Sequence, residues 1–264
     1  ALHHVKEEGR NDWAIYRTEM STAVPAKPGF LQELSQALER DQFELWYQPT
    51  WHAEDKTIHG FEALLRWRHP EQGVLLPNLF IPTLEQTGLI IPVGNWAIEA
   101  ACRQLHFWTE QGFSQWTLSL NLSPVQFEQQ DIFPVVSSML EKYNLSPSRL
   151  ILEVTESTAL KNLDRSIELL EAFNRAGITV SIDDFGTGYS NLLMLSVLPA
   201  KELKIDRSFV TSMLENEKSY KLVETIMSIA RTMEMNVVAE GIETEAQQAE
   251  LTRLGCDYLQ GYLF

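Results

Sequence analysis

Short apolar runs alternate with amphipathic stretches along most of the chain, and this pattern predicts strands and helices in turn. The apolar runs of the second half are nearly continuous, which is typical of strands buried on both faces of a parallel sheet. Strands are expected at 43–51, 58–67, 117–121, 150–153, 180–183, 203–206, 237–240 and 258–260. Helices with an apolar stripe are expected at 31–38, 96–108, 132–143, 163–176 and 221–233, and between the Thr244 capping box and Gly255.

This order of elements predicts an α/β fold built from repeated strand-then-helix units. About eight strands in that rhythm favour a closed (β/α)8 barrel over an open doubly wound sheet. No Gly-x-Gly-x-x-Gly motif follows the first strand, which counts against a dinucleotide-binding fold. A chain of 264 residues has the size of one such barrel.

The first 30 residues do not share this pattern. The stretch 6–11 is typical of a helix that stops at a glycine, so residues 1–20 are interpreted as the end of a preceding domain. Two prolines then indicate a linker, and residues 21–35 are expected to connect the two parts. The barrel is expected to occupy residues 36–264.

Composition narrows the possible functions. The net charge of −15 disfavours nonspecific binding to nucleic acid, and no apolar run is long enough to span a bilayer. No signal sequence opens the chain. Cys102 and Cys256 do not form a metal-type pair, and none of the six histidines pairs with another at catalytic zinc spacing. A reduced, cytoplasmic setting is therefore expected.

Polar side chains stand at the ends of the expected strands. In chain order they are Gln48, Glu62, Asn121, Glu153, Asp183 with Asp184, Lys204 with Asp206, Glu240 and Gln260. In a barrel these ends meet at one mouth, where the active site lies. So many carboxylates repel one another unless cations lie between them, and oxygen ligands suit Mg²⁺ or Mn²⁺. Asp183 and Asp184 could bridge two ions about 3.5–4 Å apart, the arrangement used for displacement at phosphorus.

Seven stretches in this order resemble the EAL-domain cyclic di-GMP phosphodiesterases. They are Glu62-Ala63-Leu64 within 61–67, Asn121-Leu122-Ser123, Glu153 to Ser157, Asp183 to Tyr189, Leu203 to Asp206, Glu240 to Glu243, and Gln260-Gly261-Tyr262. Together they are highly specific, although Glu-Ala-Leu alone would mean little. Residues 6–11 and Tyr16 resemble the end of a GGDEF domain, a shorter and less specific match.

The resemblance implies hydrolysis of cyclic di-GMP to linear pGpG in a barrel whose first strand is antiparallel. It implies that Glu62, Asn121, Glu153 and Asp183 hold one metal ion, and that Asp183 and Asp184, helped by Glu240, hold a second. Lys204 would orient the attacking water, and Glu240 is the candidate base. It further implies substrate contacts from Gln48, Leu64, Arg66, Asp206, Glu243 and Gln260, while Glu156 braces the loop after Asp184.

The resemblance also implies a setting for the domain. Mg²⁺ or Mn²⁺ would support turnover, whereas Ca²⁺ would bind without supporting it because of its larger size and looser geometry. The resemblance suggests that two copies pair near the glycine-rich loop. It is also consistent with a bacterial signalling module that belongs to a larger, membrane-anchored or sensor protein.

Simpler interpretations remain open for several of these residues. Arg66 could form a structural salt bridge, and Asp206 could pair with Lys204, since positions two apart share a strand face. Gln48 could be structural, and Glu243 could serve only the start of the next helix. For the whole domain, the alternatives are a cyclic di-GMP receptor without turnover and a metal-free glycoside hydrolase. The latter predicts two dominant acids instead of a ring that includes Asn121 and Lys204.

Overall fold

The computed structural model describes residues 29–186 and 197–264. The chain divides into two compact units, one of residues 1–44 and 65–90 and the other of residues 45–64 and 91–264. The GGDEF-like remnant expected at residues 1–20 and the glycine-rich turn beyond Gly186 lie outside the described residues.

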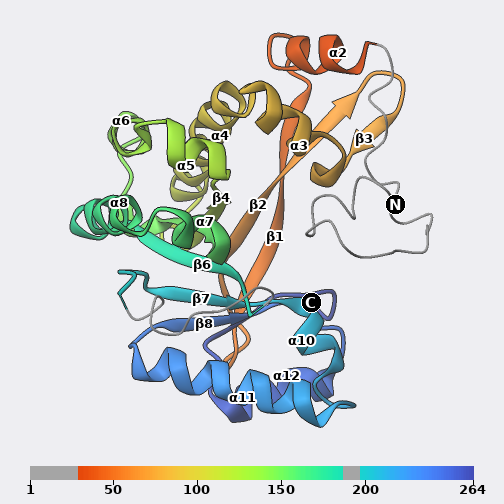
Figure 1. The fold of residues 1–264 in the computed structure, drawn as a ribbon, viewed down its shortest axis with the longest axis vertical. Helices are drawn as coiled ribbons and strands as arrows, with labels where there is room; N and C mark the ends of the chain where they lie inside the picture. The colour runs from red at the N-terminus through yellow and green to blue at the C-terminus, as the bar shows by residue number, and fades with distance from the viewer. Residues whose placement is uncertain (1–28, 187–196) are drawn as a thin grey trace, which may run out of the picture. The chain divides into compact units, whose positions relative to one another are not determined.

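Eight strands form a closed ring that belongs to the second unit except for the start of β1 and the end of β2. They are β1 (Phe43–His52), β2 (Ile58–His69), β4 (Thr117–Asn121), β5 (Leu150–Thr155), β6 (Thr179–Phe185), β7 (Glu202–Ile205), β8 (Asn236–Ala239) and β9 (Tyr258–Leu259). Their order is β1-β9-β8-β7-β6-β5-β4-β2, and pairing of β1 with β2 closes the ring (Figure 1). Neighbours from β2 to β9 are parallel, whereas β1 is antiparallel to β9. The predicted barrel with an antiparallel first strand is confirmed.

Helices cover the outside of this ring. They are α4 (Ile90–Glu110), α5 (Pro124–Gln129), α6 (Ile132–Lys142), α7 (Glu156–Lys161), α8 (Leu163–Ala176), α10 (Arg207–Ser212), α11 (Glu217–Thr232) and α12 (Glu245–Leu254). Helix α8 packs against β6, and α11 packs against β7 and β8 (Figure 1). In the part of the chain that is described, no helix is both long and apolar enough to cross a membrane.

The strands are buried on both faces, as their near-continuous apolar character predicts. Every residue of β7 is buried, and its two faces differ in chemistry. Leu203 and Ile205 belong to the apolar core cluster, while Glu202 and Lys204 alternate with them. Because successive side chains of a strand point to opposite faces, the acid and the lysine share the face that lines the barrel interior.

The first unit has its own small core. It contains α2 (Phe30–Ala37), β3 (Gly73–Leu75) and α3 (Pro77–Thr87), together with the start of β1 and the end of β2. Trp67 is fully buried and packs edge-on against Phe30 and Phe80, with ring centroids 5.3 and 6.0 Å away. Its indole Nε1 donates a hydrogen bond to Gln42 at 3.1 Å, so the polar end of the ring is also satisfied.

Most predicted helices lie where they were expected, but α4 begins six residues before the predicted start at Trp96. Pro92 falls in its first turn, where a missing N–H costs nothing. Gly94 is needed inside the helix because a Cβ there would lie 2.0 Å from Nε2 of Gln126 on α5. The glycine thus permits close packing of α5, which the hydrophobic pattern alone did not reveal.

Candidate active site

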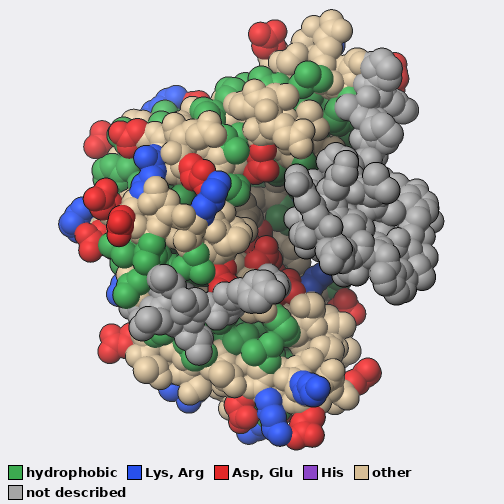
Figure 2. Space-filling view, viewed as in Figure 1, with side chains coloured by type: hydrophobic (Ala, Val, Ile, Leu, Met, Phe, Trp, Pro, Cys, Tyr) green, Lys and Arg blue, Asp and Glu red, His purple; other side chains and the backbone are tan. Residues whose placement is uncertain are grey.

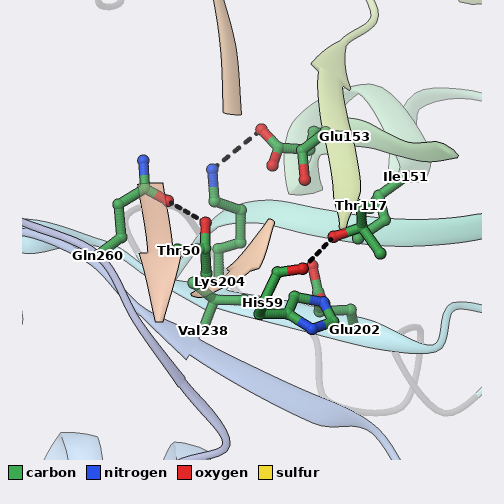
Figure 3. A pocket seen from close by; sticks show the side chains of 10 residues that line it. Thr50, His59, Thr117, Ile151, Glu153, Glu202, Lys204, Val238 and Gln260 are labelled. Atoms are coloured by element: carbon green, nitrogen blue, oxygen red, sulfur yellow. Dashed lines mark hydrogen bonds and ion pairs between the residues drawn. The ribbon is translucent and has the colours of Figure 1, made fainter. Parts of the chain in front are cut away.

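Four carboxylates, from β2, β5, β6 and the residue after β8, surround one lysine inside the second unit. The ammonium Nζ of Lys204 lies 2.6 Å from Glu240, 2.9 Å from Glu153, 3.3 Å from Glu62 and 3.7 Å from Asp183. Lys204, Glu62 and Glu153 are buried, and Figure 3 shows the ammonium pointing toward Glu153. The predicted convergence is therefore present for these five residues, which we call the Lys204 cluster, but Glu62 lies inside β2 and not at its end.

Glu62 is held in place by two amides as well as by the lysine. Asn121 donates to its Oε1 at 2.8 Å, and Gln260 donates to its Oε2 at 2.7 Å. Gln260 in turn accepts a hydrogen bond from the Thr50 hydroxyl at 3.4 Å (Figure 3). Predicted residues from β2, β4 and the end of β9 thus form one connected network, and Thr50 joins it as a residue that the sequence did not single out.

Burial and mutual repulsion perturb the acids of the Lys204 cluster. Burial and the negative charge of Glu62 raise the pKa of Glu153 well above its ordinary value. Burial opposes ionisation of Glu62, but the Lys204 ammonium and its amide hydrogen bonds lower its pKa. Burial raises the pKa of Glu240 to about 7. Burial opposes the charge of Lys204, yet the surrounding carboxylates raise its pKa well above the ordinary value, so it remains an ammonium.

The Asp183-Asp184 pair lies at an irregularity of β6. The strand continues to Phe185, two residues beyond the predicted end, and its register with β7 shifts between Ile182 and Phe185. Asp184 has a φ of 55°, in the left-handed region that is uncommon for a residue other than glycine. Burial and the charge of Asp183 raise the pKa of Asp184. Backbone strain beside two adjacent carboxylates is typical of a functional position.

The donor chemistry of this site fits hard divalent cations, although the acids are turned toward the lysine. One ammonium faces four carboxyl groups, so further positive charge would be favourable, and all the acids offer oxygen ligands. Among the described residues, however, no three acids, histidines or cysteines already have the geometry to hold an ion. Figure 2 shows acidic side chains together near the middle of this face, close to where β6 and β7 lie in Figure 1.

Other predicted site residues have local structural roles. Asp206 is the N-cap of α10 and accepts a hydrogen bond from Ser208 N at 3.0 Å. Its pairing with Lys204, one of the open alternatives, is wrong for the described residues, because the four ion pairs of Lys204 go to Glu62, Glu153, Asp183 and Glu240. Glu243 is exposed and stands just before the Thr244 capping box, where its backbone N–H donates to Gln247 at 2.9 Å.

The three remaining substrate candidates lie on β1 and β2. Gln48 and Leu64 are half-buried residues of the second unit, and no hydrogen bond of the Gln48 side chain is found within the described part of the chain. Arg66 belongs to the first unit, where its Nη1 donates to the carbonyl of Leu65 at 2.9 Å. Their roles in substrate binding stay predictions.

Glu156 contacts the beginning of the loop that it was expected to brace. It is buried at the first position of α7, and its Oε2 accepts a hydrogen bond from the N–H of Gly186 at 3.3 Å. Gly186 has a φ of 93°, so an amino acid with a side chain would be strained there. The contact supports the bracing role for the part of the loop that is described.

Sequence reasoning also missed Glu202, a buried acid that follows Lys201 and begins β7. It is 3% exposed and stands two residues before Lys204 on the same strand face. Burial raises its pKa to about 7, while the nearby Ser181 hydroxyl and the Lys204 ammonium oppose the rise. The strand predicted from the sequence began at Leu203, so Glu202 fell outside it and nothing in the sequence indicated that this acid would be buried.

Comparison with known proteins agrees with this site. The EAL domain model matches residues 31–264. The chain is 45% identical over 263 residues to the bifunctional diguanylate cyclase/cyclic di-GMP phosphodiesterase MucR of Pseudomonas aeruginosa, covering 100% of this chain and 38% of that protein. It is 38% identical over 264 residues to the cyclic di-GMP phosphodiesterase NbdA of the same organism, covering 100% of this chain and 34% of that protein.

Solved structures give the same result. The cyclic di-GMP complex of the PaMucR phosphodiesterase is 48% identical with a TM-score of 0.85, covering 88% of this chain and 94% of that one. The EAL enzyme Bd1971 with cAMP and cyclic di-GMP bound is 34% identical with a TM-score of 0.84, covering 99% and 69% of the two chains.

A closed barrel with acidic side chains gathered at the carboxyl ends of its strands has the architecture of a barrel enzyme. The chain belongs to the EAL domain family. The predicted membership of a family that includes named cyclic di-GMP phosphodiesterases is thereby confirmed. The chain spans only 38% of MucR and 34% of NbdA, so activities of those whole proteins do not transfer automatically.

Proposed function

We propose that this domain hydrolyses cyclic di-GMP to linear pGpG. The observation that carries the proposal is the convergence of Glu62, Glu153, Asp183 and Glu240 on Lys204 at the mouth of the barrel. A water molecule adds its oxygen to one phosphorus of the cyclic dinucleotide, and the bond to one ribose 3′-oxygen breaks. The departing oxygen takes up a proton, which leaves a linear dinucleotide with a 5′-phosphate.

Divalent cations complete this site in the proposal. Glu62, Asn121, Glu153, Asp183 and Asp184 would hold Mg²⁺ or Mn²⁺, two ions in all, which when bound supply Lewis-acid stabilisation and lower the pKa of the attacking water. The uncompensated negative charge around Lys204 and the oxygen-only donor set support this assignment.

Side chains of the domain carry out the other parts of the proposed reaction. Lys204 directs its ammonium at the centre of the cluster, where it orients the attacking water and stabilises negative charge that develops on phosphate oxygens. Glu240 is suited to accept a proton near neutrality because burial raises its pKa to about 7. Gln260 and Asn121 fix the rotamer of Glu62 through their amide hydrogen bonds.

A metal-dependent hydrolysis assay tests the proposal. Purified domain should release pGpG from cyclic di-GMP with Mg²⁺ or Mn²⁺, and turnover should stop with chelator. Ca²⁺ should bind without supporting appreciable turnover. Glu62→Ala and Asp183→Ala should each abolish turnover, whereas Glu234→Ala, outside the cluster, should leave it unchanged. Wild-type rates in either cluster variant would refute the assignment.

The alternative is a receptor that binds cyclic di-GMP without hydrolysing it. Every ligand position inferred from the motifs carries the expected residue type, which favours turnover. Tight binding with no pGpG in Mg²⁺ and Mn²⁺ would establish the receptor instead. A homodimer and a larger, membrane-anchored parent protein remain predictions, as do the boundaries of the domains that precede the barrel.

A further inference from the structure

The barrel interior below the Lys204 cluster is polar and hollow. A small cavity there, which we call the inner cavity, is lined by Thr50, Thr117, Ser119, Glu153, Glu202 and Lys204, among others (Figure 3). The interior of a barrel of this kind is usually filled by bulky branched side chains. Here only Ile151 and Val238 of the lining residues are of that kind, and the others carry polar groups, so this level of the barrel is largely polar.

Glu202 has little compensation within the described residues. Its carboxyl group is 3% exposed, and among these residues it forms no ion pair and no hydrogen bond of normal geometry, so the nearby Ser181 hydroxyl and Lys204 ammonium oppose its burial only in part. Ser181, which stands opposite it in the register of β6 and β7, is fully buried, and its hydroxyl also has no hydrogen-bond partner in the described part. Burying such groups without partners destabilises a protein, so an apolar residue at position 202 would be the more stable choice.

The inner cavity has the size and the chemistry to hold water. The volume of the inner cavity is about 10 Å³. One bound water needs roughly 10–15 Å³. A buried water also needs two to four polar partners, roughly, and the carboxyl groups, hydroxyls and ammonium of the wall offer them. The wall is shared, because Glu153 and Lys204 belong both to this cavity and to the cluster above it.

We propose that the inner cavity binds one water molecule between Glu202 and the Lys204–Glu153 pair, and that Glu202 is a positioning residue acting on the reaction through Lys204. The positioning role rests on the proposed function. Glu202 and its water support the lysine from the side away from the substrate. They fix the ammonium relative to Glu153, to which it donates at 2.9 Å. An apolar side chain at position 202 would remove that support while leaving every residue of the Lys204 cluster in the chain.

The test compares Glu202→Leu with Glu202→Gln, which keeps hydrogen-bonding capacity and nearly the same shape. Ile151→Leu, on the wall of the same cavity, controls for repacking. Steady-state kinetics with cyclic di-GMP and Mg²⁺, thermal unfolding, and high-resolution crystal structures of wild type and Glu202→Leu are measured for the full chain.

We expect Glu202→Leu to unfold at the same or a higher temperature than wild type, yet to lose about 10- to 100-fold in kcat through misplacement of Lys204. Its KM should stay within about threefold, because the substrate-binding groups are untouched. Glu202→Gln and Ile151→Leu should keep most of the wild-type kcat. The wild-type crystal structure should show one water within hydrogen-bond distance of Glu202, and the leucine variant none.

Three results would overturn the proposal. They are a dry inner cavity in the wild-type crystal structure, an unchanged kcat in Glu202→Leu, and a loss in Glu202→Gln as large as in Glu202→Leu. Absence of turnover in wild type would instead refute the proposed function and with it the positioning role, while the crystal structure would still decide whether water is bound.

Discussion

At the scale of single residues, Lys204 has the most consequential position in the domain. Its ammonium is the positive charge shared by four buried or half-buried carboxylates. Each of these carboxylates forms an ion pair with it. Breaking a buried ion pair by removing one partner leaves charge without compensation, which is costlier than losing an exposed pair. The lysine is therefore important for stability as well as for the proposed chemistry.

Lys204→Met is expected to lower the free energy of unfolding by about 3–5 kcal/mol in the presence of chelator. Excess Mg²⁺ or Mn²⁺ should restore much of the stability, because cations that bind only the folded state stabilise it. Turnover should stay lost in both conditions. Urea unfolding with and without metal measures the effect. Lys221→Met, which removes only an exposed pair with Glu217, should change little in either condition. Equal stability of Lys204→Met and wild type in chelator would contradict this role of the lysine.

The sequence was informative about residue types at the site and less so about their contacts. Asn121, Glu153 and Lys204 were identified because each stands near the end of an apolar strand and matches a motif. Glu62 also matches a motif, but it lies inside β2 and not at the strand end where it was expected. The local role of Asp206 as the N-cap of α10 was missed, since a strand-face argument cannot tell where the strand stops. The left-handed backbone of Asp184 depends on the register of β6 against β7, which is a property of tertiary structure.

At the scale of elements, three short helices begin directly after strands of the barrel. The N-caps of α5, α7 and α10 are Ser123, Thr155 and Asp206, each within two residues of a strand end. Such helices are difficult to predict from hydrophobic periodicity, because six residues are too few to show an apolar stripe. Their side-chain caps were nevertheless present in the motifs, so capping was the better signal for them.

Glu156→Ala tests the link between α7 and the loop after β6. Removal of the acceptor for the Gly186 N–H should weaken apparent affinity for Mn²⁺ or for cyclic di-GMP several-fold, because that loop follows the Asp183-Asp184 pair directly. Calorimetric titration of each ligand measures it. Glu156→Gln, which keeps a carbonyl oxygen in the same place, should retain most of the affinity. Unchanged affinity of Glu156→Ala for both ligands would count against the bracing role.

Arg149 has a comparable role at the opposite end of β5. It is buried, and its guanidinium donates to the carbonyls of Trp116 at 2.9 Å, Phe113 at 3.0 Å and Leu105 at 3.4 Å, and to the Thr109 hydroxyl. It thereby satisfies the carbonyls of Phe113 and Trp116, which follow α4, and adds a hydrogen bond to that of Leu105 inside the helix.

Arg149→Met should therefore destabilise the domain by about 2–4 kcal/mol, because it leaves several buried acceptors without donors. The midpoint of urea unfolding measures the change, and kcat per folded molecule should be unaffected. Arg149→Lys, which can satisfy fewer of these carbonyls, should fall between wild type and Arg149→Met. A methionine variant as stable as wild type would show that these carbonyls find other donors.

At the scale of the whole molecule, the barrel followed from the order of elements, whereas the polarity of its interior did not. Near-continuous apolar strands predicted burial on both faces, and the ring of eight strands confirms it. The division into two compact units was not predicted, because β1 and β2 run through both and show no break in sequence. Glu202 was overlooked for a similar reason, since its burial depends on the closure of the ring.

Because closure of the strand ring buries Glu202, the stability of the domain should decrease as the pH rises. Burial raises the pKa of Glu202 from its ordinary value of 4.5 to about 7 in the folded domain. Between these values the folded state binds more protons than the unfolded state, so stability is lost as the pH rises through this window. A shift of this size corresponds to about 3.5 kcal/mol at most, at about 1.4 kcal/mol per pKa unit.

Glu202→Gln removes this titration, so its free energy of unfolding should gain on that of wild type as the pH rises from 5 to 8. Urea unfolding of both proteins in chelator at several pH values gives the difference, in which titration of Glu240 and the other acids largely cancels. Glu250→Gln serves as the control. Hydrogen bonds from Arg253 and Tyr220 lower the pKa of Glu250 to about 2, so it is already ionised throughout this range and its difference from wild type should stay constant. A constant difference for Glu202→Gln as well would show that Glu202 titrates in the folded barrel as it does in the unfolded chain, and that the interior of the barrel solvates its charge.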